Sequence, residues 1–292
     1  MFDHNKLEDS LRCLHFHRGD REYFRWRLAD VAETAAKAGQ EGRKRYAAHA
    51  LKLIADDRNL YWALEHLHRY GGGAPGPDGM TLQDVVDESS RWAMCRALRD
   101  DIKNQRYVPG DIRKKTIPKC SGKGTRTITI QNLEDRVVYR GAKQVLEPIL
   151  DPMFLANSFG YRPGQDRSHA LVQAIELTQS EKRFVWVQGD IADAFDNVPL
   201  GTVFDLFKQH LPSQALEELI RRCLYVGQGT KGLLQGSSLS PLCLNLYLHH
   251  KLDGPWQKRC PKIPLIRYAD DILLLANRGV RPERRGRAWS IC

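Results

Sequence analysis

Hydrophobic positions recur with a helical period over much of this chain of 292 residues. Residues 1–70 place Leu7, Leu11 and Leu14 on one face and are rich in Ala, Leu, Arg and Glu, which predicts a helical N-terminal segment. In the segment 168–178, Ser168 is expected to be the N-cap of the helix. Helices are also predicted from the same period over residues 81–107, 134–150, 213–226 and 240–252.

Three segments have strand patterns instead. TRTITI (125–130) alternates β-branched and polar residues, FVWVQG (184–189) is short and mostly apolar, and PLIRYADDILLLA (264–276) forms two apolar runs about a tight turn. SGKG (121–124) is typical of a hairpin connection, and GGGAPGPDG (71–79) of a loop. We therefore expect an α+β fold with an antiparallel sheet that carries helices 213–226 and 240–252 on one face.

Three carboxylates stand at the ends of apolar strands. Asp190 ends one strand, and Asp270 with Asp271 lies at the turn of the predicted hairpin. Like charges held close in an apolar setting are costly, and a divalent cation removes that cost. Oxygen ligands of this kind suit Mg²⁺, so we expect the strand to pair beside the hairpin and the three acids to bind metal. The alternative, acids in surface turns, is favoured only for Asp193 and Asp196.

Composition adds an electrostatic argument. The net charge of +10 favours a polyanionic partner such as nucleic acid, although a solvated basic surface remains open. Arginine and aromatic residues interleave near the N-terminus, which fits either an RNA-facing surface or an ordinary amphipathic helix: Tyr23, Arg25, Trp26, Arg27, Lys44, Arg45 and Tyr46. The seven cysteines form no CxxC pair, which argues against a zinc ribbon or a disulfide framework. Without a signal peptide or a membrane-length apolar run, the protein is expected to be soluble and cytoplasmic, with no membrane partner.

Five sequence blocks, in order over residues 71–276, carry a family resemblance. They are GAPGPDGMT, the DR…LEP…SFGYRP stretch, GDIADAFDNVP, GLLQGSSLSPLCLNLYLHHKLD and RYADDILLLA. Together they resemble the reverse transcriptase domain of the group II intron and group II-like bacterial family. The resemblance implies a right-hand polymerase: a helical N-terminal extension (1–70), fingers (71–183), and a palm with an antiparallel sheet (184–277).

The resemblance also implies a set of site residues. Asp190, Asp270 and Asp271 are the implied catalytic acids and hold two Mg²⁺ ions, for which Mn²⁺ can substitute, with the backbone carbonyl of Ile191 as a further ligand. Phe195 would lie beneath the sugar and exclude a 2′-OH, with ordinary packing as the alternative. The implied nucleotide-binding residues are Lys119, Arg126, Phe195, Gln235 and Gly236. Arginine and lysine suit a triphosphate, although either could be an ordinary hairpin residue. Arg162 fits a template or fingers contact, or equally well a structural salt bridge.

The function implied is RNA-directed DNA polymerase activity, a two-metal nucleotidyl transfer from a dNTP to a primer 3′-OH. The implied partners are an RNA template, a DNA or RNA primer, dNTPs and a structured intron or non-coding RNA. Both a mobile element, as in group II introns, and a domesticated role in antiviral defence stay open.

Two departures from the family pattern affect this interpretation. RTITIQN (126–132) stands where many relatives have R-P-L-G-I-P, and the chain reads only RGVRPERRGRAWSIC after LLLAN. The palm is therefore expected to be incomplete, with no thumb, and residues 278–292 are expected to be a basic disordered tail. A fragment, a frameshifted product and one subunit of a split enzyme all fit this ending. The alternative function is a catalytically weak or inactive RNA-binding module, or one part of a split defence-associated reverse transcriptase.

Overall fold

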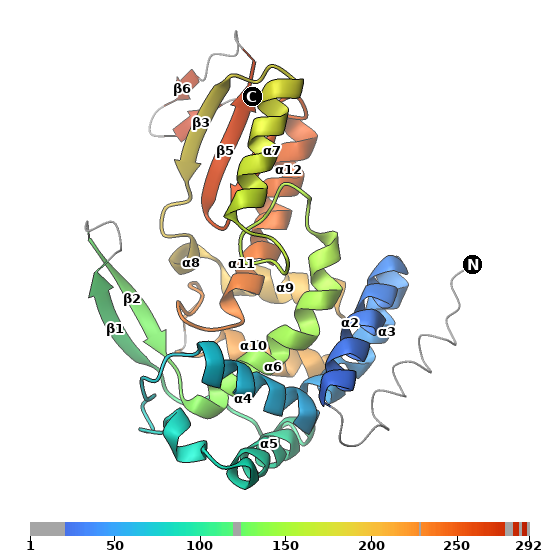
Figure 1. Ribbon diagram of the computed structural model, residues 1–292, viewed down its shortest axis with the longest axis vertical. Coiled ribbons are helices and arrows are strands. Elements are labelled where there is room, and N and C mark those ends of the chain that lie inside the picture. The colour runs from blue at the N-terminus through green and yellow to red at the C-terminus, as the bar shows by residue number, and fades with distance from the viewer. Residues whose placement is uncertain (1–20, 119–123, 228, 278–282, 286–287, 291–292) are drawn as a thin grey trace. The chain divides into compact units, whose positions relative to one another are not determined.

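The computed structural model describes residues 21–118, 124–227, 229–277, 283–285 and 288–290 (Figure 1). Two compact units alternate along the chain: the first combines Met1–Met153 with Phe195–Cys243, and the second combines Phe154–Ala194 with Leu244–Cys292. Helices and small antiparallel sheets confirm the predicted α+β class. None of the helices in the described ranges is long and apolar enough to span a membrane.

The first unit is mostly helical. Its one sheet in the described residues is a hairpin in which β1 (Arg113–Pro118) pairs antiparallel with β2 (Thr125–Ile130), as the alternating pattern predicts. Residues 71–79 form an irregular connection, as expected from their glycines and prolines. The helical elements are α2 (Arg21–Lys37), α3 (Gly39–Ile54), α4 (Asp57–Tyr70), η1 (Leu82–Val85), α5 (Glu88–Lys103), α6 (Leu133–Leu150), η2 (Asp151–Met153), α8 (Ala194–Asn197), α9 (Leu200–His210) and α10 (Gln214–Leu224).

Helix α6 is central to the core of this unit and packs against α2, α3 and α4. The buried hydroxyl of Tyr46 donates to the carbonyl oxygen of Val145 at 2.9 Å. Buried Asn59 donates from Nδ2 to the carbonyl oxygen of Gly141 at 3.1 Å, and Gln144 donates to Asn59 Oδ1 at 2.9 Å. These three buried polar side chains are thus hydrogen-bonded, as burial requires. The N-terminal helices are therefore an integral part of the first unit.

Helix α10 differs from the sequence-based expectation. Its apolar face, with buried Leu216, Leu219 and Ile220, packs in the first unit against α3 and α9. The prediction that helix 213–226 covers a face of the antiparallel sheet built from the 184–189 and 264–276 strands is therefore wrong. The helical period indicated that a face is buried, but it carried no information on which surface buries it.

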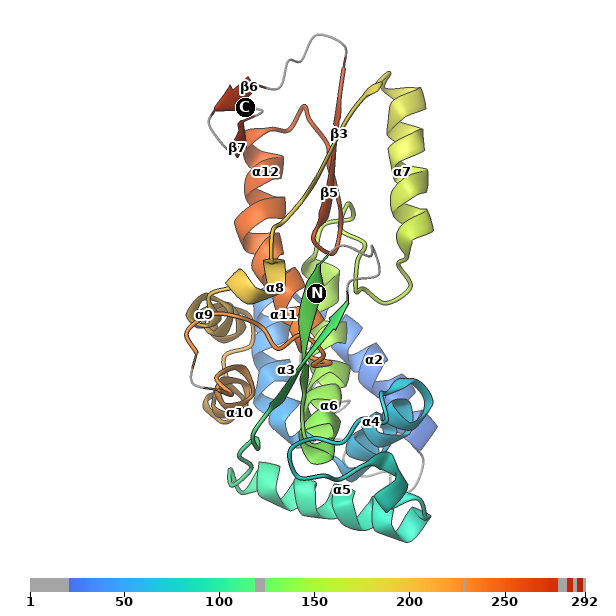
Figure 2. The ribbon, with the colours of Figure 1, turned by 90° about the vertical axis from the view of Figure 1, so that its left-hand side faces the viewer.

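The second unit is built on a three-stranded antiparallel sheet with strand order β3-β5-β4. These strands are β3 (Val185–Asp190), β4 (Leu265–Tyr268) and β5 (Asp271–Ala276). Helix α7 (Arg167–Ser180) covers one face, where Ala170 and Ala174 pack against Ile266 and Leu275. Helix α12 (Gly254–Arg259) lies on the opposite face, so that the sheet is sandwiched between the two helices (Figure 2). The predicted pairing of the 184–189 strand beside the hairpin is confirmed.

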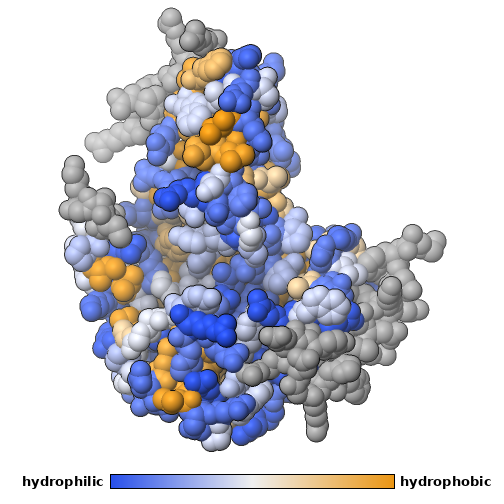
Figure 3. Space-filling model, viewed as in Figure 1, coloured by the Kyte–Doolittle hydropathy of each residue, from blue (hydrophilic) through white to orange (hydrophobic). Residues whose placement is uncertain are grey.

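The start of α7 corrects a smaller prediction. Asp166, not Ser168, is the N-cap: its carboxylate accepts hydrogen bonds from the backbone nitrogens of Ser168 at 2.7 Å and His169 at 3.1 Å. Aspartate and serine are both good caps, and two of them stand close together here. On its outer side α7 exposes Leu171, Val172 and Ile175. Figure 3 shows that apolar residues also reach the surface of the molecule among the polar ones.

The predicted helix 240–252 is longer than expected and contains an irregular turn. It runs as α11 (Ser240–Leu248), a π-helical turn (His249–Asp253) and α12. The wider turn brings buried Asp253 to the sheet. Beyond the sheet, β6 (Glu283–Arg285) and β7 (Ala288–Ser290) pair antiparallel, where the basic tail was expected to have no regular structure.

Candidate active site

The three candidate acidic residues occupy neighbouring backbone positions at one end of the sheet in the second unit. The β3–β5 register places Asp190 directly opposite Asp271. Asp270 lies in the turn between β4 and β5, and its carbonyl oxygen accepts a hydrogen bond from the backbone nitrogen of Ile191 at 3.0 Å. The two strand ends predicted from the sequence are therefore backbone neighbours.

Electrostatics at this end of the sheet disfavours the ionised form of Asp271. The pKa of the Asp271 carboxyl is raised, first by desolvation and then by the negative charges of Asp270 and Asp190. Carboxylates with this effect on one another are a donor set that fits a hard divalent cation such as Mg²⁺. Within the described ranges, however, no three His, Cys, Asp or Glu side chains are already gathered as a metal-binding group. Carboxylate donors suit such an ion, and the backbone brings the three residues side by side. Their side chains, however, do not form a complete set of metal ligands.

The turn that carries Asp270 has an unusual backbone. Tyr268 and Asp271 are paired, so only Ala269 and Asp270 connect the strands. Ala269 has a φ of 60°, a left-handed conformation that suits a tight hairpin but that alanine rarely adopts. Gly160 packs directly against this turn: a Cβ atom there would lie 2.1 Å from the Ala269 nitrogen. The glycine of the SFGYRP block is thus required where the chain passes the hairpin turn.

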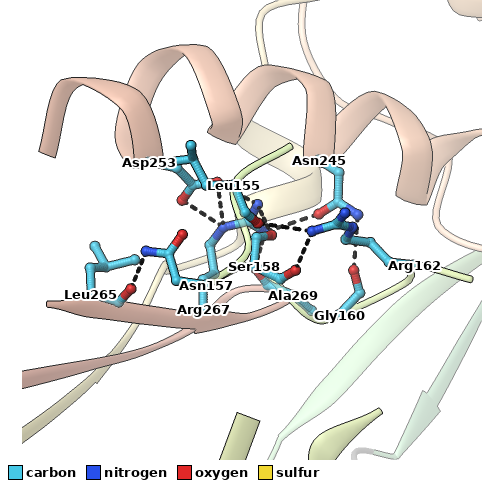
Figure 4. Close-up of polar contacts among 10 residues, drawn as sticks. All are labelled: Leu155, Asn157, Ser158, Gly160, Arg162, Asn245, Asp253, Leu265, Arg267 and Ala269. Carbon is cyan, nitrogen blue, oxygen red and sulfur yellow. Dashed lines mark hydrogen bonds and ion pairs between the residues drawn. The ribbon is translucent and has the colours of Figure 1, made fainter. Parts of the chain in front are cut away.

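Arg267 lies beneath the same turn with its side chain fully buried (0 % exposed). Its guanidinium donates to both Asp253 oxygens, with the shortest distance 2.7 Å from Nη2 to Oδ2. Nη1 donates to the carbonyl oxygen of Ala269 at 2.9 Å and to Asn245 Oδ1 at 2.9 Å. Nη2 also donates to Ser158 Oγ at 2.6 Å (Figure 4). These hydrogen bonds satisfy the buried charge of Arg267 and connect the strained turn to α11 and the π-helical turn.

The segment before α7 completes this network. Residues 157–159 run parallel to β4: the backbone nitrogen of Arg267 donates to the Asn157 carbonyl oxygen, and that of Phe159 donates to the Arg267 carbonyl oxygen, both at 2.9 Å. Asn245 Nδ2 donates to the carbonyl oxygen of Gly160 at 2.9 Å. Arg162 donates to the carbonyl oxygens of Leu155 and Ser158 at 2.9 and 2.7 Å. Two of its partners are therefore backbone carbonyl oxygens of the same segment.

The residues expected to contact the nucleotide lie in the first unit. Gly236 has a φ of 111°, and a Cβ atom there would lie 2.7 Å from the Thr129 carbonyl oxygen on β2. The backbone nitrogen of Thr129 donates to the carbonyl oxygen of Gln235 at 2.6 Å. Gln235 Nε2 donates to both carboxylate oxygens of Asp196 at 3.1 Å. The Gln-Gly pair is therefore fixed against the hairpin by its backbone and against α8 by its side chain.

The other predicted binding residues differ in their location and exposure. Phe195 is half-buried on α8, and its carbonyl oxygen accepts a hydrogen bond from the Leu233 nitrogen at 2.8 Å. Arg126 is exposed on β2, opposite Ile117. Lys119 falls outside the described residues. The structure thus places Phe195, Gln235, Gly236 and Arg126 in one unit and the three acids with Ile191 in the other.

Several residues of these arrangements were missed from the sequence. Asp196, interpreted as a surface turn residue, anchors Gln235. Arg267 stands directly before the YADD residues, and an arginine between isoleucine and tyrosine in a buried strand is the signal that could have indicated a paired internal charge. Gly160 and Asn245 carried no such signal, because their partners lie far away in the chain.

Comparison with known proteins identifies a matching family and several related sequences. Residues 112–285 match the family described as "Reverse transcriptase (RNA-dependent DNA polymerase)". The chain is 33 % identical over 180 residues to the "Uncharacterized 91 kDa protein in cob intron" of Schizosaccharomyces pombe, covering 59 % of this chain and 21 % of that protein. It is 26 % identical over 227 residues to the "Group II intron-encoded protein LtrA" of Lactococcus lactis, covering 75 % of this chain and 37 % of that protein.

The "Protein YkfC" of Escherichia coli is 28 % identical over 264 residues, covering 74 % of this chain and 68 % of that protein. The chain spans only 21 % and 37 % of the two intron-associated relatives. Among solved structures, the "Partial Cas6-RT-Cas1--Cas2 complex" aligns with a TM-score of 0.48 and 22 % identity, covering 77 % of this chain and 38 % of that one.

Proposed function

Because this chain belongs to the reverse transcriptase family and is related to group II intron-encoded proteins, we propose that it synthesises DNA on an RNA template. In this reaction a primer 3′-OH attacks the α-phosphate of a dNTP, and pyrophosphate leaves. The observation that carries the proposal is the pairing of β3 with β5, which sets Asp190 opposite Asp271 and beside the turn of Asp270.

The chain's own residues would have separate tasks. Asp190, Asp270 and Asp271, with the Ile191 carbonyl, would hold divalent ions, and family members generally use such ions. When bound, two Mg²⁺ ions would stabilise charge on the attacking and leaving oxygens, and Mn²⁺ would substitute. Arg267, Asn245 and Gly160 would keep the hairpin turn, and with it Asp270, in a fixed position.

The nucleotide-contacting residues of the proposal are those that the family resemblance indicates. Gln235 and Gly236 would contact the incoming nucleotide, and Phe195 would exclude a 2′-OH. Lys119 and Arg126 would bind its triphosphate, since guanidinium and ammonium groups both suit phosphate. The support from the structure is local: the Gln-Gly backbone is fixed against β2, and its glycine cannot carry a side chain there.

A primer-extension assay on an RNA template with Mg²⁺ tests the proposal. Asp270→Asn should lower the extension rate by at least about 1,000-fold, since each ~1.4 kcal/mol of lost transition-state stabilisation is tenfold and a metal ligand contributes several kcal/mol. Asp205→Asn removes the same charge from an exposed position on α9 and should leave the rate within about twofold. Extension that survives in Asp270→Asn would rule out this assignment.

A second candidate function is nucleic-acid binding without synthesis, in an inactive module or one part of a split defence-associated enzyme. It is favoured by the observation that the acids in the described part of the chain are not gathered into a ready metal-binding group. The same assay separates the two functions. Tight RNA binding with no extension by the wild-type protein would support the binding function.

A further inference from the structure

A strongly basic pocket lies among three helices of the first unit. It encloses about 190 Å³ between α2, α4 and α6. Its polar lining comes mainly from three arginines on three different helices: Arg25, Arg69 and Arg140. Trp62, His66 and Tyr70 line it from α4, where positions four apart lie on one face of a helix. One carboxylate, Glu65, also faces it.

The three guanidiniums are not paired with any carboxylate of the residues that the structure describes. Across the described ranges, neither Arg25, Arg69 nor Arg140 forms an ion pair, whereas Arg27 and Arg45 on the neighbouring helices pair with Asp30 and Glu41. The guanidinium of Arg25 lies over the Trp62 ring, 4.8 Å from its centroid. Arg140 donates from Nε to Gln144 Oε1 at 3.2 Å, which leaves its other nitrogens for a ligand. Unpaired like charges around a cavity lack the anion that would stabilise them.

The titration of neighbouring groups agrees with an excess of positive charge. Desolvation, followed by the charges of Arg140, Lys143 and Arg25, lowers the pKa of His66 to about 4. Burial and the charge of Arg25 also lower the pKa of Arg140. The neutral imidazole of His66 keeps a buried Nδ1 atom without a hydrogen-bond partner. A ligand rich in hydrogen-bond acceptors could accept from the arginines and also contact Nδ1 of His66.

We propose that this pocket binds the phosphodiester backbone of a single strand of nucleic acid, while the ring of Tyr70 stacks on an adjacent base. The planar fork of arginine matches phosphate oxygens, and three forks from three helices would hold a phosphate from several sides. Tyr70 is 74 % exposed and tilts against the His66 ring at 4.9 Å, so its outer face is open to a base. This inference deepens the proposed function, on which it rests only for the choice of nucleic acid as the ligand.

Fluorescence anisotropy without divalent ions tests the pocket separately from catalysis. The probes are a labelled single-stranded RNA of about 20 nucleotides and a DNA of the same sequence, each titrated at several salt concentrations. Combined Arg25→Gln, Arg69→Gln and Arg140→Gln should weaken binding by about 10-fold or more and reduce the slope of log K against log salt by about 0.7, since the pocket holds one phosphate and each phosphate contact to a single strand contributes ~0.7. Tyr70→Ala should weaken binding by about 5-fold with little change in slope.

The matched control combines Arg96→Gln, Lys103→Gln and Lys208→Gln, which removes the same charge from exposed positions on α5 and α9 outside the pocket. It should change affinity by less than about threefold. Because Arg25 and Arg69 are exposed, their double variant preserves folding and repeats the test without the half-buried Arg140. Weaker binding of RNA, of DNA or of both by the pocket variants would support the proposal and show which kind of strand the pocket binds. Equal loss in the pocket and control variants, or none in either, would overturn the proposal whether or not the protein extends primers.

Discussion

Two sets of arginines in this protein have opposite environments. Arg267, in the second unit, is completely buried and donates to Asp253, Asn245, Ser158 and the Ala269 carbonyl. The pocket arginines of the first unit face a cavity and form no ion pair with any carboxylate in the described part of the chain. A guanidinium that satisfies its donors internally holds the backbone in place, and one that leaves them open is suited to an external anion.

The contrast also applies along the β4–β5 hairpin. Beneath the turn, positive and negative charges are matched in the Arg267–Asp253 pair. At its end, desolvation and then the negative charges of Asp270 and Asp190 raise the pKa of Asp271. Chemistry is therefore expected where charge is unbalanced, and rigidity where it is balanced. The following variants test this division.

Replacement of Arg267 should have the largest effect on stability. Arg267→Met leaves Asp253 buried and uncompensated, and should lower the free energy of unfolding by roughly 3–5 kcal/mol. Combined Arg267→Met and Asp253→Leu removes both charges and should regain part of this loss. Urea unfolding monitored by circular dichroism measures both. If Arg267→Met were as stable as the wild type, Arg267 would not hold the turn.

Gly160→Ala separates the position of the turn from its charge. The new methyl group would overlap the Ala269 backbone and push the hairpin turn out of place. We expect a stability loss of about 1–3 kcal/mol and a primer-extension rate reduced by about 10-fold or more, since a small misplacement of catalytic groups is costly. Gly201→Ala, whose Cβ would meet only the Tyr225 hydroxyl at 3.7 Å, is the matched control. Equal rates in the two variants would contradict a positioning role for Gly160.

Asp271→Asn should have the smallest effect on stability, and it should stabilise the folded state where the other variants destabilise it. Because the pKa of Asp271 is raised, ionisation above that pKa destabilises the folded state, and stability returns as pH falls through it. Without divalent ions, Asp271→Asn should therefore melt about 2 °C or less above the wild type at pH 7, and no higher below pH ~3.9. Mg²⁺ should reverse the order. A less stable variant at pH 7 without metal would contradict repulsion at the hairpin end.

Sequence reasoning succeeded where the information is local. Alternating and apolar runs located β2, β3 and the β4–β5 hairpin, and the acids at their ends lie together because antiparallel pairing follows from those runs. It failed where a partner lies far along the chain. Arg267 meets Ser158 from 109 residues away, and no pattern near either residue indicates the other.

The same limit explains the other errors. The period of α10 indicated a buried face, but packing on α3 and α9 depends on tertiary structure. Asp196 resembled an ordinary turn acid until the QG segment was placed beside it. The pocket arginines come from α2, α4 and α6, and only Arg25 belonged to the basic aromatic region singled out from the sequence.

The π-helical turn His249–Asp253 makes this part of the chain sensitive to length. In a regular α-helix each residue advances by about 100°, so positions 245 and 253 would point in directions roughly 80° apart. A turn closed by wider hydrogen bonds uses more residues per rotation and brings Asp253 back toward Asn245, so that both reach Arg267. Insertions and deletions between these positions should consequently be excluded from functional relatives, even where most intervening side chains vary.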